Sequence, residues 1–317
     1  MVRTFIIDTD TASDDAVAIL MALRHPDVEV AGITVVHGNV PLHQCLANAL
    51  YTLEVAGVDV PVWAGADRPL LRPASTAQAF HGIDGLGDAG YGPPSRTPEA
   101  GHGADALIDL VRANPGCTLV TLGPLTNVAL AISRAPDIVD HVGRCVVMGG
   151  AANTVGNVTP AAEFNIWVDP DAAAIVFRSG LPIEMVGWEL CRGDAALSQD
   201  EYEALRALGT PAAKFAIGCQ AAVIRAIADM EGVPSITLPD PVAMAVALEP
   251  EICIRSSRHL VEVETTSELT RGMTVVDALD VASRRDFGPA WELARAVTVC
   301  REIDIPRWKS LLRTCLA

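Results

Sequence analysis

Short apolar runs rich in valine and isoleucine alternate with stretches of helical periodicity along most of the chain. Strands are predicted at residues 4–7, 28–36, 118–122, 145–148 and 183–188. A helix is predicted from Leu42 to Ala56, closed by Gly57. This alternation is typical of βαβ units, so we expect one α/β domain over residues 1–317, with a doubly wound, mostly parallel, Rossmann-like sheet.

Start and stop signals support two further helices. Ser13 is expected to cap a helix whose first turn carries Asp14 and Asp15, where carboxylates suit the helix dipole. Farther along, Asp169 and Pro170 are typical of a helix start, and Gly180 of its end.

The second half of the chain contains two less regular regions. Residues 197–230 are alanine-rich and strongly helical apart from a break at 209–211, and we expect this segment to form a cap over the carboxyl ends of the strands. The apolar runs at 252–254 and 260–263 predict an edge hairpin, followed by a C-terminal helix.

Composition restricts the possible partners. Half of the 317 residues are apolar and a fifth are charged, with a net charge of -16, which disfavours binding to a nucleic-acid polymer. The N-terminus lacks the features of a secretory signal, and no apolar run is long enough to predict a membrane span. The eight cysteines are scattered singly, which is typical of reduced thiols in a cytoplasmic protein.

Four carboxylates gather near the amino end. The predicted first strand delivers Asp8 and Asp10 to its carboxyl end, and the next helix begins with Asp14 and Asp15. Ligand sites of open α/β sheets lie beyond this edge. Crowded carboxylates favour a hard cation such as calcium or magnesium, whereas an acidic first turn on a surface helix is the purely structural alternative.

Polar clusters also follow later predicted strands, at HGN (37–39), LGPLTN (122–127) and GNVTPAAEFN (156–165). Each cluster alone is typical of an ordinary turn. Together they offer amides and a carboxylate suited to binding hydroxyl groups.

These segments resemble the inosine-uridine preferring nucleoside hydrolase family. The resemblance rests on DTDTASDD, HGN, HGIDGLGD, LGPLTN, the MGG run, AEFNIWVDPDAA and PDPVAMAVALEP, which together extend over most of the chain. Thr11 and Ala12 stand where many members carry proline and glycine. This departure changes the turn and leaves the carboxylates in place.

The resemblance implies hydrolysis of the N-glycosidic bond of a ribonucleoside. It implies Ca²⁺ held by Asp10, Asp15, the backbone carbonyl of Thr126 and Asp240, with Asp10 also the general base toward water. The residues implied to bind the sugar are Asp14, Asn39, Asn157, Glu163 and Asn165. No organic cofactor is expected, and the resemblance suggests a homodimer or homotetramer.

The match departs from the family at the proton donor. Many members carry a histidine just before the last metal aspartate, where this chain has Pro239, which has no proton to give. His81, in a glycine-rich loop, is the candidate replacement, and Trp188 and Glu189 are candidates to face the base. We therefore expect a preference for purines or other easily activated leaving groups.

Three other interpretations remain open from the residues. A haloacid dehalogenase-like phosphatase would use Asp8 as nucleophile and Asp10 as acid, but it needs a downstream lysine, and neither Lys214 nor Lys309 lies near an acidic motif. The GLGDAG run fits GxGxxG but follows no strand. A nucleoside- or ribose-binding protein without catalysis is compatible with Pro239.

Overall fold

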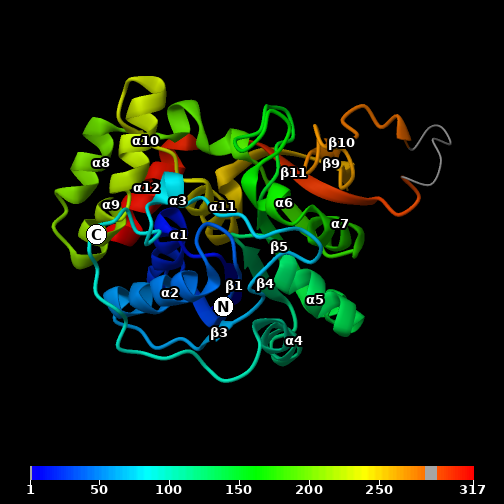
Figure 1. Cartoon of the computed structure of the whole chain (residues 1–317), viewed down its shortest axis with the longest axis horizontal. Coiled ribbons are helices and arrows are strands. Elements are labelled where there is room, and N and C mark those ends of the chain that lie inside the picture. Colours follow the sequence, from blue (N-terminus) through cyan, green and yellow to red (C-terminus); the bar gives the residue numbers. More distant parts are fainter. Residues whose placement is uncertain (1, 283–290) are drawn as a thin grey trace.

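The computed structural model describes residues 2–282 and 291–317. Within this part of the chain, one large sheet forms the centre of the molecule (Figure 1). Its strands, in spatial order, are β10 (Thr274–Val276), β9 (Cys253–Val263), β11 (Arg295–Ile303), β6 (Ile183–Val186), β5 (Val142–Met148), β4 (Cys117–Thr121), β1 (Arg3–Thr9), β2 (Val28–Val35) and β3 (Val62–Ala64). The predicted doubly wound α/β fold is confirmed.

The strand order determines where a ligand can bind. From β3 through β11 all neighbouring strands are parallel, in the order 3-2-1-4-5-6 of a Rossmann-like sheet. The order reverses between β1 and β4, whose connections leave toward opposite faces. The carboxyl ends of these two strands are therefore the expected position of a binding crevice.

The predicted edge hairpin is wrong. Residues 252–263 contain no turn, and Cys253–Val263 forms the single strand β9, antiparallel to both β11 and β10. The polar stretch between the two apolar runs contains no glycine or proline, so nothing interrupts the extended backbone, and its side chains are largely exposed.

Both faces of the sheet are covered. In β1, Phe5 and Ile7 belong to a buried cluster with α1 (Ser13–Arg24), α2 (Leu42–Ala56), α11 (Pro239–Leu248) and α12 (Ile305–Leu316). Ile6, on the opposite side of the strand, belongs to a second cluster with α4 (Gly103–Ala113), α5 (Thr126–Arg134) and α7 (Pro170–Arg178). Burial of both faces explains the continuous apolar sequence of this strand.

Residues 199–231 form α8 (Gln199–Arg206), α9 (Pro211–Gly218) and α10 (Ala221–Glu231), which gather with α12 on one side of the molecule (Figure 1). Thr210 and Pro211 end the break between α8 and α9, with the Thr210 hydroxyl capping α9. No single helix in the described ranges is long and apolar enough to cross a membrane; α9 and α10 reach that length only as a pair bent by 40°.

Most predicted helix boundaries match the structure. Gly57 adopts a left-handed conformation at the end of α2, and the Asp169 carboxylate caps α7. Ser13 is an exception, because the capping position of α1 falls on Ala12 and Ser13 is the first helical residue. Asp15, the third helical residue, accepts a hydrogen bond from the Ala12 amide at 2.9 Å, which is the return half of a capping box.

Candidate active site

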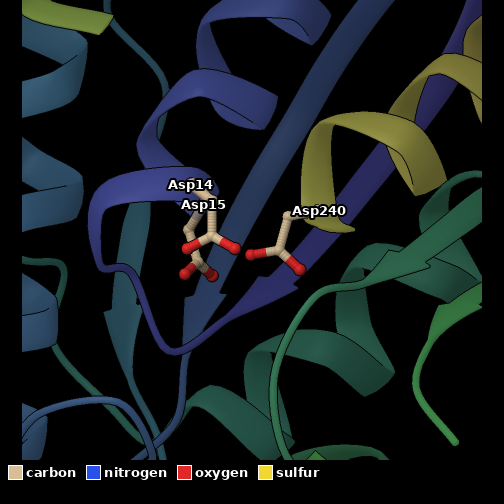
Figure 2. A group of neighbouring side chains, drawn as sticks. All are labelled: Asp14, Asp15 and Asp240. Atoms are coloured by element: carbon tan, nitrogen blue, oxygen red, sulfur yellow. The ribbon is translucent and has the colours of Figure 1, made fainter. Parts of the chain in front are cut away.

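Three carboxylates from two helices that are far apart in the sequence converge beside the end of β1. Asp14 and Asp15 lie in the first turn of α1, and Asp240 lies in the first turn of α11 (Figure 2). One oxygen from each lies within 4.8 Å of the others, and all three residues are buried. Since α1 and α11 pack against each other, this approach is fixed by the fold.

Asp10 lies next to this group, at the turn between β1 and α1. One of its oxygens accepts a hydrogen bond of 2.7 Å from the Asn39 amide. Gly38 and Gly123 press their backbones against the same carboxylate, and a β-carbon at either position would overlap it. This close contact explains why glycines are needed in the HGN and LGPLTN segments.

Burial and mutual repulsion disfavour charge on these groups. Burial, followed by the charge of Asp15, raises the pKa of Asp10 well above its usual range. The pKa values of Asp14 and Asp15 are raised to about 6, mainly by burial, and that of Asp240 is raised strongly by burial and then by Asp15. In the absence of a cation, the cluster must hold protons near neutral pH.

Asp8 is separate from this group. Its carboxylate accepts hydrogen bonds from the Thr34 hydroxyl (2.5 Å) and the Asn127 amide (2.8 Å), and burial raises its pKa to about 7. The prediction that four neighbouring acids form one cluster is therefore wrong for Asp8. This residue ties β1 to β2 and α5 beneath the site.

The carboxylate cluster fits a divalent cation. One oxygen of Asp10 and one of Asp14 are buried without a hydrogen-bond partner, although buried polar atoms are normally satisfied. All donors in the cluster are oxygens, the ligands that calcium and magnesium prefer over softer metals. A cation here would satisfy these oxygens and neutralise their charge.

A cavity of about 1090 Å³ opens above the cluster. This volume is ample for a small organic ligand. Nearly all residues that the sequence assigned to sugar or base binding line it: Asp14, Asn39, His81, Asn157, Glu163, Asn165 and Trp188. These residues lie in the loops and first helical turns that follow different strands, as in a site at the carboxyl edge of a parallel sheet.

Glu163 and Asn165 are held in place by the backbone. Glu163 caps α6 (Phe164–Val168), accepting hydrogen bonds from the amides of Asn165 (2.8 Å) and Gly150 (2.9 Å). Burial nevertheless raises its pKa to about 7. The Asn165 side chain donates to the carbonyl of Leu122 at 2.8 Å, which leaves its oxygen available to the cavity. The Asn157 oxygen accepts from the Phe164 amide.

Thr126 does not lie where the resemblance implied. It lines a second, smaller cavity, and its hydroxyl is engaged by Asp169 (2.7 Å) and His37 (3.2 Å). As the first residue of α5, it directs its carbonyl along the helix toward the amide four residues on. Leu122, directly after β4, lines the large cavity instead.

His81 lines the cavity at the end of α3 (Gln78–His81). Its Nδ1 lies 2.8 Å from the Ser13 hydroxyl and 3.8 Å from an Asp14 oxygen. Burial lowers the pKa of His81 to about 4 despite the nearby carboxylate of Asp15, so the ring is uncharged at neutral pH. Ser13, which was predicted to cap α1, therefore orients the ring of His81 through its hydroxyl.

Trp188 and Glu189 have different environments. Trp188 lines the cavity, and its amide donates to the carbonyl of Gly150 at 2.9 Å. Glu189 is absent from the lining and accepts hydrogen bonds from the amide of Ala152. Glu189 was predicted to face the base, but the structure places its carboxylate against the loop that contains Ala152.

The sequence agrees with this geometry. The model of the family described as inosine-uridine preferring nucleoside hydrolase matches residues 5–310. The chain belongs to the nucleoside hydrolase family. As a nucleoside hydrolase it is an N-glycosyl hydrolase, and the phosphatase and purely ligand-binding interpretations are set aside. The GLGDAG segment lies in the loop between α3 and α4 and does not connect a strand to a helix, so it does not form a dinucleotide-binding turn.

Relatives of this nucleoside hydrolase support the assignment along its length. An uncharacterized protein of Schizosaccharomyces pombe is 43% identical over 278 residues, covering 86% of this chain and 88% of that protein. The pyrimidine-specific ribonucleoside hydrolase RihB of Escherichia coli K12 is 35% identical over 283 residues, covering 89% and 90%.

Solved structures of nucleoside hydrolases are also similar. A plant nucleoside hydrolase has a TM-score of 0.92 at 32% identity, and the purine-preferring ribonucleoside hydrolase from Gardnerella vaginalis has a TM-score of 0.89 at 32% identity. In both cases the alignment covers 99% of this chain and 98% of the other.

Several residues of the cavity were missed from the sequence. They include Phe80, Arg192 and Gln220. Gln220 directly precedes α10, and its side-chain amide donates a hydrogen bond to the carbonyl of Ser13 at 2.8 Å. None of these residues stands in an acidic or asparagine-rich motif, so only the fold identifies them.

Proposed function

We propose that this nucleoside hydrolase cleaves ribonucleosides to ribose and free base with the help of a bound Ca²⁺. The observation that carries the proposal is the meeting of Asp14, Asp15 and Asp240, with Asp10 beside them, at a cavity lined by amides and carboxylates. Calcium suits this set because it accepts several carboxylate, carbonyl and hydroxyl oxygens in flexible geometry.

The ligands of the cation would be Asp10, Asp15 and Asp240, with Asp14 close enough to contribute. We replace Thr126 in the implied ligand set by the carbonyl of Leu122, since Leu122 lines the cavity and Thr126 does not. When bound, the cation supplies Lewis-acid polarisation of oxygen atoms at the floor of the cavity.

In the proposed reaction, Asp10 accepts the proton of the attacking water, whose oxygen bonds to the anomeric carbon as the bond to the base breaks. The backbone amide of Asn39 donates to Asp10 and holds its carboxylate in the required orientation. The sugar passes through an oxocarbenium-like state, and the carboxylates of Asp14 and Glu163 stabilise its positive charge. Asn39, Asn157 and Asn165 hold the ribose hydroxyls and fix the sugar against the water.

The base would occupy the part of the cavity between His81, Trp188 and α10, so that the helical segment at 197–230 covers the ligand. His81 is placed to donate a hydrogen bond to the base from its uncharged ring. Because Pro239 removes the usual proton donor, we propose a preference for purines. The names of the similar proteins include both pyrimidine-specific and purine-preferring enzymes.

We further propose a cytoplasmic homodimer or homotetramer. The eight cysteines are free thiols and all but Cys253 are buried, which suits a reducing compartment. The oligomeric state rests on the family resemblance, and light scattering coupled to size-exclusion chromatography measures it.

The proposal is tested with a nucleoside panel assayed for ribose release, with and without a calcium chelator. Asp10→Asn should lower kcat by about 10³-fold or more, because it removes the base while keeping the size of the side chain. The matched control Asp137→Asn changes a surface carboxylate paired with Arg112 and should leave kcat unchanged. Undiminished turnover by Asp10→Asn, or no base release from any nucleoside, contradicts the proposal.

A further inference from the structure

The cavity wall contains one arginine for which the described residues provide no acidic partner. Among the described residues that line the cavity, Arg192 and Lys309 are the lysine and arginine side chains. Lys309 forms an ion pair of 2.7 Å with Glu201. Arg192 makes no ion pair and no side-chain hydrogen bond within the described part of the chain, although Asp194 lines the same wall.

The ring of Trp188 supports Arg192. Its guanidinium carbon lies 5.9 Å from the Trp188 ring centroid, within the range of a cation–π contact. The short helical turn from Trp188 to Cys191 joins the two residues. The ring attracts the cation without cancelling its charge, so the guanidinium keeps its hydrogen-bond donors for a ligand.

This turn is attached to the sugar-binding end of the cavity. Gly150 donates its amide to Glu163 at 2.9 Å, and its carbonyl accepts from the amide of Trp188 at 2.9 Å. Two hydrogen bonds through the backbone of Gly150 therefore connect Trp188 with Glu163, a carboxylate assigned to the ribose. Arg192 directly follows the helical turn that begins at Trp188. Because Arg192 and Glu163 line the same cavity, a base attached to that ribose would share the cavity with the arginine.

We propose that Arg192 stabilises the negative charge that develops on the departing base, and that it thereby compensates for the absence of a proton donor at Pro239. The inference rests on the proposed hydrolysis. As the bond between the anomeric carbon and the base nitrogen breaks, its electron pair passes to the base and spreads onto ring carbonyl oxygens. Arg192 binds this anion, which takes its proton from solvent after release.

The benefit of stabilising charge on the leaving group depends on how stable that group already is as an anion. Uracil is a poor leaving group that gains much from a nearby cation, whereas 4-nitrophenolate is stable as an anion on its own. Stabilisation by Arg192 therefore accelerates uridine much more than 4-nitrophenyl β-D-ribofuranoside. A residue needed only for folding or for ribose binding affects both substrates equally.

The test compares kcat and KM for these two substrates in Arg192→Ala, Arg192→Lys and the native chain, with calcium present. Arg192→Ala should lower kcat for uridine by about tenfold or more and that for the nitrophenyl riboside by less than about threefold. Arg192→Lys should recover part of the uridine rate, because it restores the charge. The control Arg225→Ala removes an exposed arginine of α10 outside the cavity lining and should change neither rate.

Equal losses on both substrates, or an unchanged uridine rate in Arg192→Ala, overturn the inference while leaving the proposed hydrolysis intact. Failure of the native chain to release base or 4-nitrophenol would instead remove the proposed function itself. The two failures are therefore distinguishable.

Discussion

The carboxylates of Asp15 and Asp240 meet at the carboxyl edge of the sheet, although one begins the first helix and the other begins a helix near the end of the chain (Figure 2). Burial raises the pKa of both groups; the charge of Asp15 raises the pKa of Asp240 further, and the charge of Asp14 raises that of Asp15. Both carboxylates are therefore destabilised as anions without a counter-charge. The fold thus holds acids together whose repulsion a cation can relieve.

Asp240→Asn should weaken calcium binding by about 100-fold or more, because it removes one negative ligand and keeps the side-chain volume. Isothermal titration of the chelator-treated protein with calcium measures the change. The same titration with Asp137→Asn, which alters a surface carboxylate, should reproduce the native affinity. Native-like affinity in Asp240→Asn would exclude this residue as a ligand.

The stability of the metal-free protein should fall as pH rises from about 5 to about 7. Asp14 and Asp15 have folded-state pKa values raised from 3.8 to about 6, and Glu163 from 4.5 to about 7. Between the unfolded and folded pKa values, the folded chain binds more protons, so its stability is lost as pH rises. The melting temperature in chelator should drop by at least about 2 °C over this interval.

Calcium should reverse this trend, because it takes the place of the protons. The melting temperature with saturating calcium should therefore be higher than in chelator at pH 7, with a smaller difference at pH 5. An apo-protein that becomes more stable between these pH values contradicts the raised pKa values.

Glu163 should produce an acidic limb in the rate profile. Its carboxylate is the form that accepts a ribose hydroxyl and stabilises the sugar cation, and burial raises its pKa to about 7. We expect kcat/KM to decline below about pH 7. In Glu163→Gln, kcat/KM should be about 100-fold lower at pH 8, and this limb should be missing. A limb that persists unchanged in the variant assigns the titration to another group.

Ser13 and His81 should act as a unit. The Ser13 hydroxyl lies 2.8 Å from Nδ1 of His81 and fixes the ring orientation, so Ser13 has no effect of its own once the ring is gone. His81→Ala should lower kcat for inosine by about tenfold, and Ser13→Ala by less. The double variant should match His81→Ala. Additive losses would show that the serine acts independently of the histidine.

Much of the fold follows from local patterns, because each element carries its own signal. The strand that precedes Asp10 is apolar on both faces, and the signals at Gly57, Asp169 and Pro170 lie where the helices begin or end. The hairpin prediction failed because no local signal was available there. The pairing of β9 with β11 depends on a strand that lies elsewhere in the sequence.

The sequence predicted those residues of the site that stand in motifs with acidic or amide side chains. Asp14, Asn39, Glu163 and Asn165 were identified this way and line one cavity. Thr126, which the resemblance implied as a carbonyl ligand, lines the smaller cavity instead, and a backbone oxygen has no residue type by which the sequence could distinguish it from its neighbours. Arg192 was missed because an unpaired arginine is identified only when its surroundings are known.

Pro239 occupies the first position of α11, where a missing amide hydrogen leaves no helical bond unmade. Its ring restricts the backbone directly before Asp240, so the chain enters the metal site with one torsion already set. A histidine in its place would bring an ionisable ring but would also loosen this entry. Position 239 thus supplies rigidity in front of Asp240 and no proton, so any help to the departing base has to come from another part of the cavity wall.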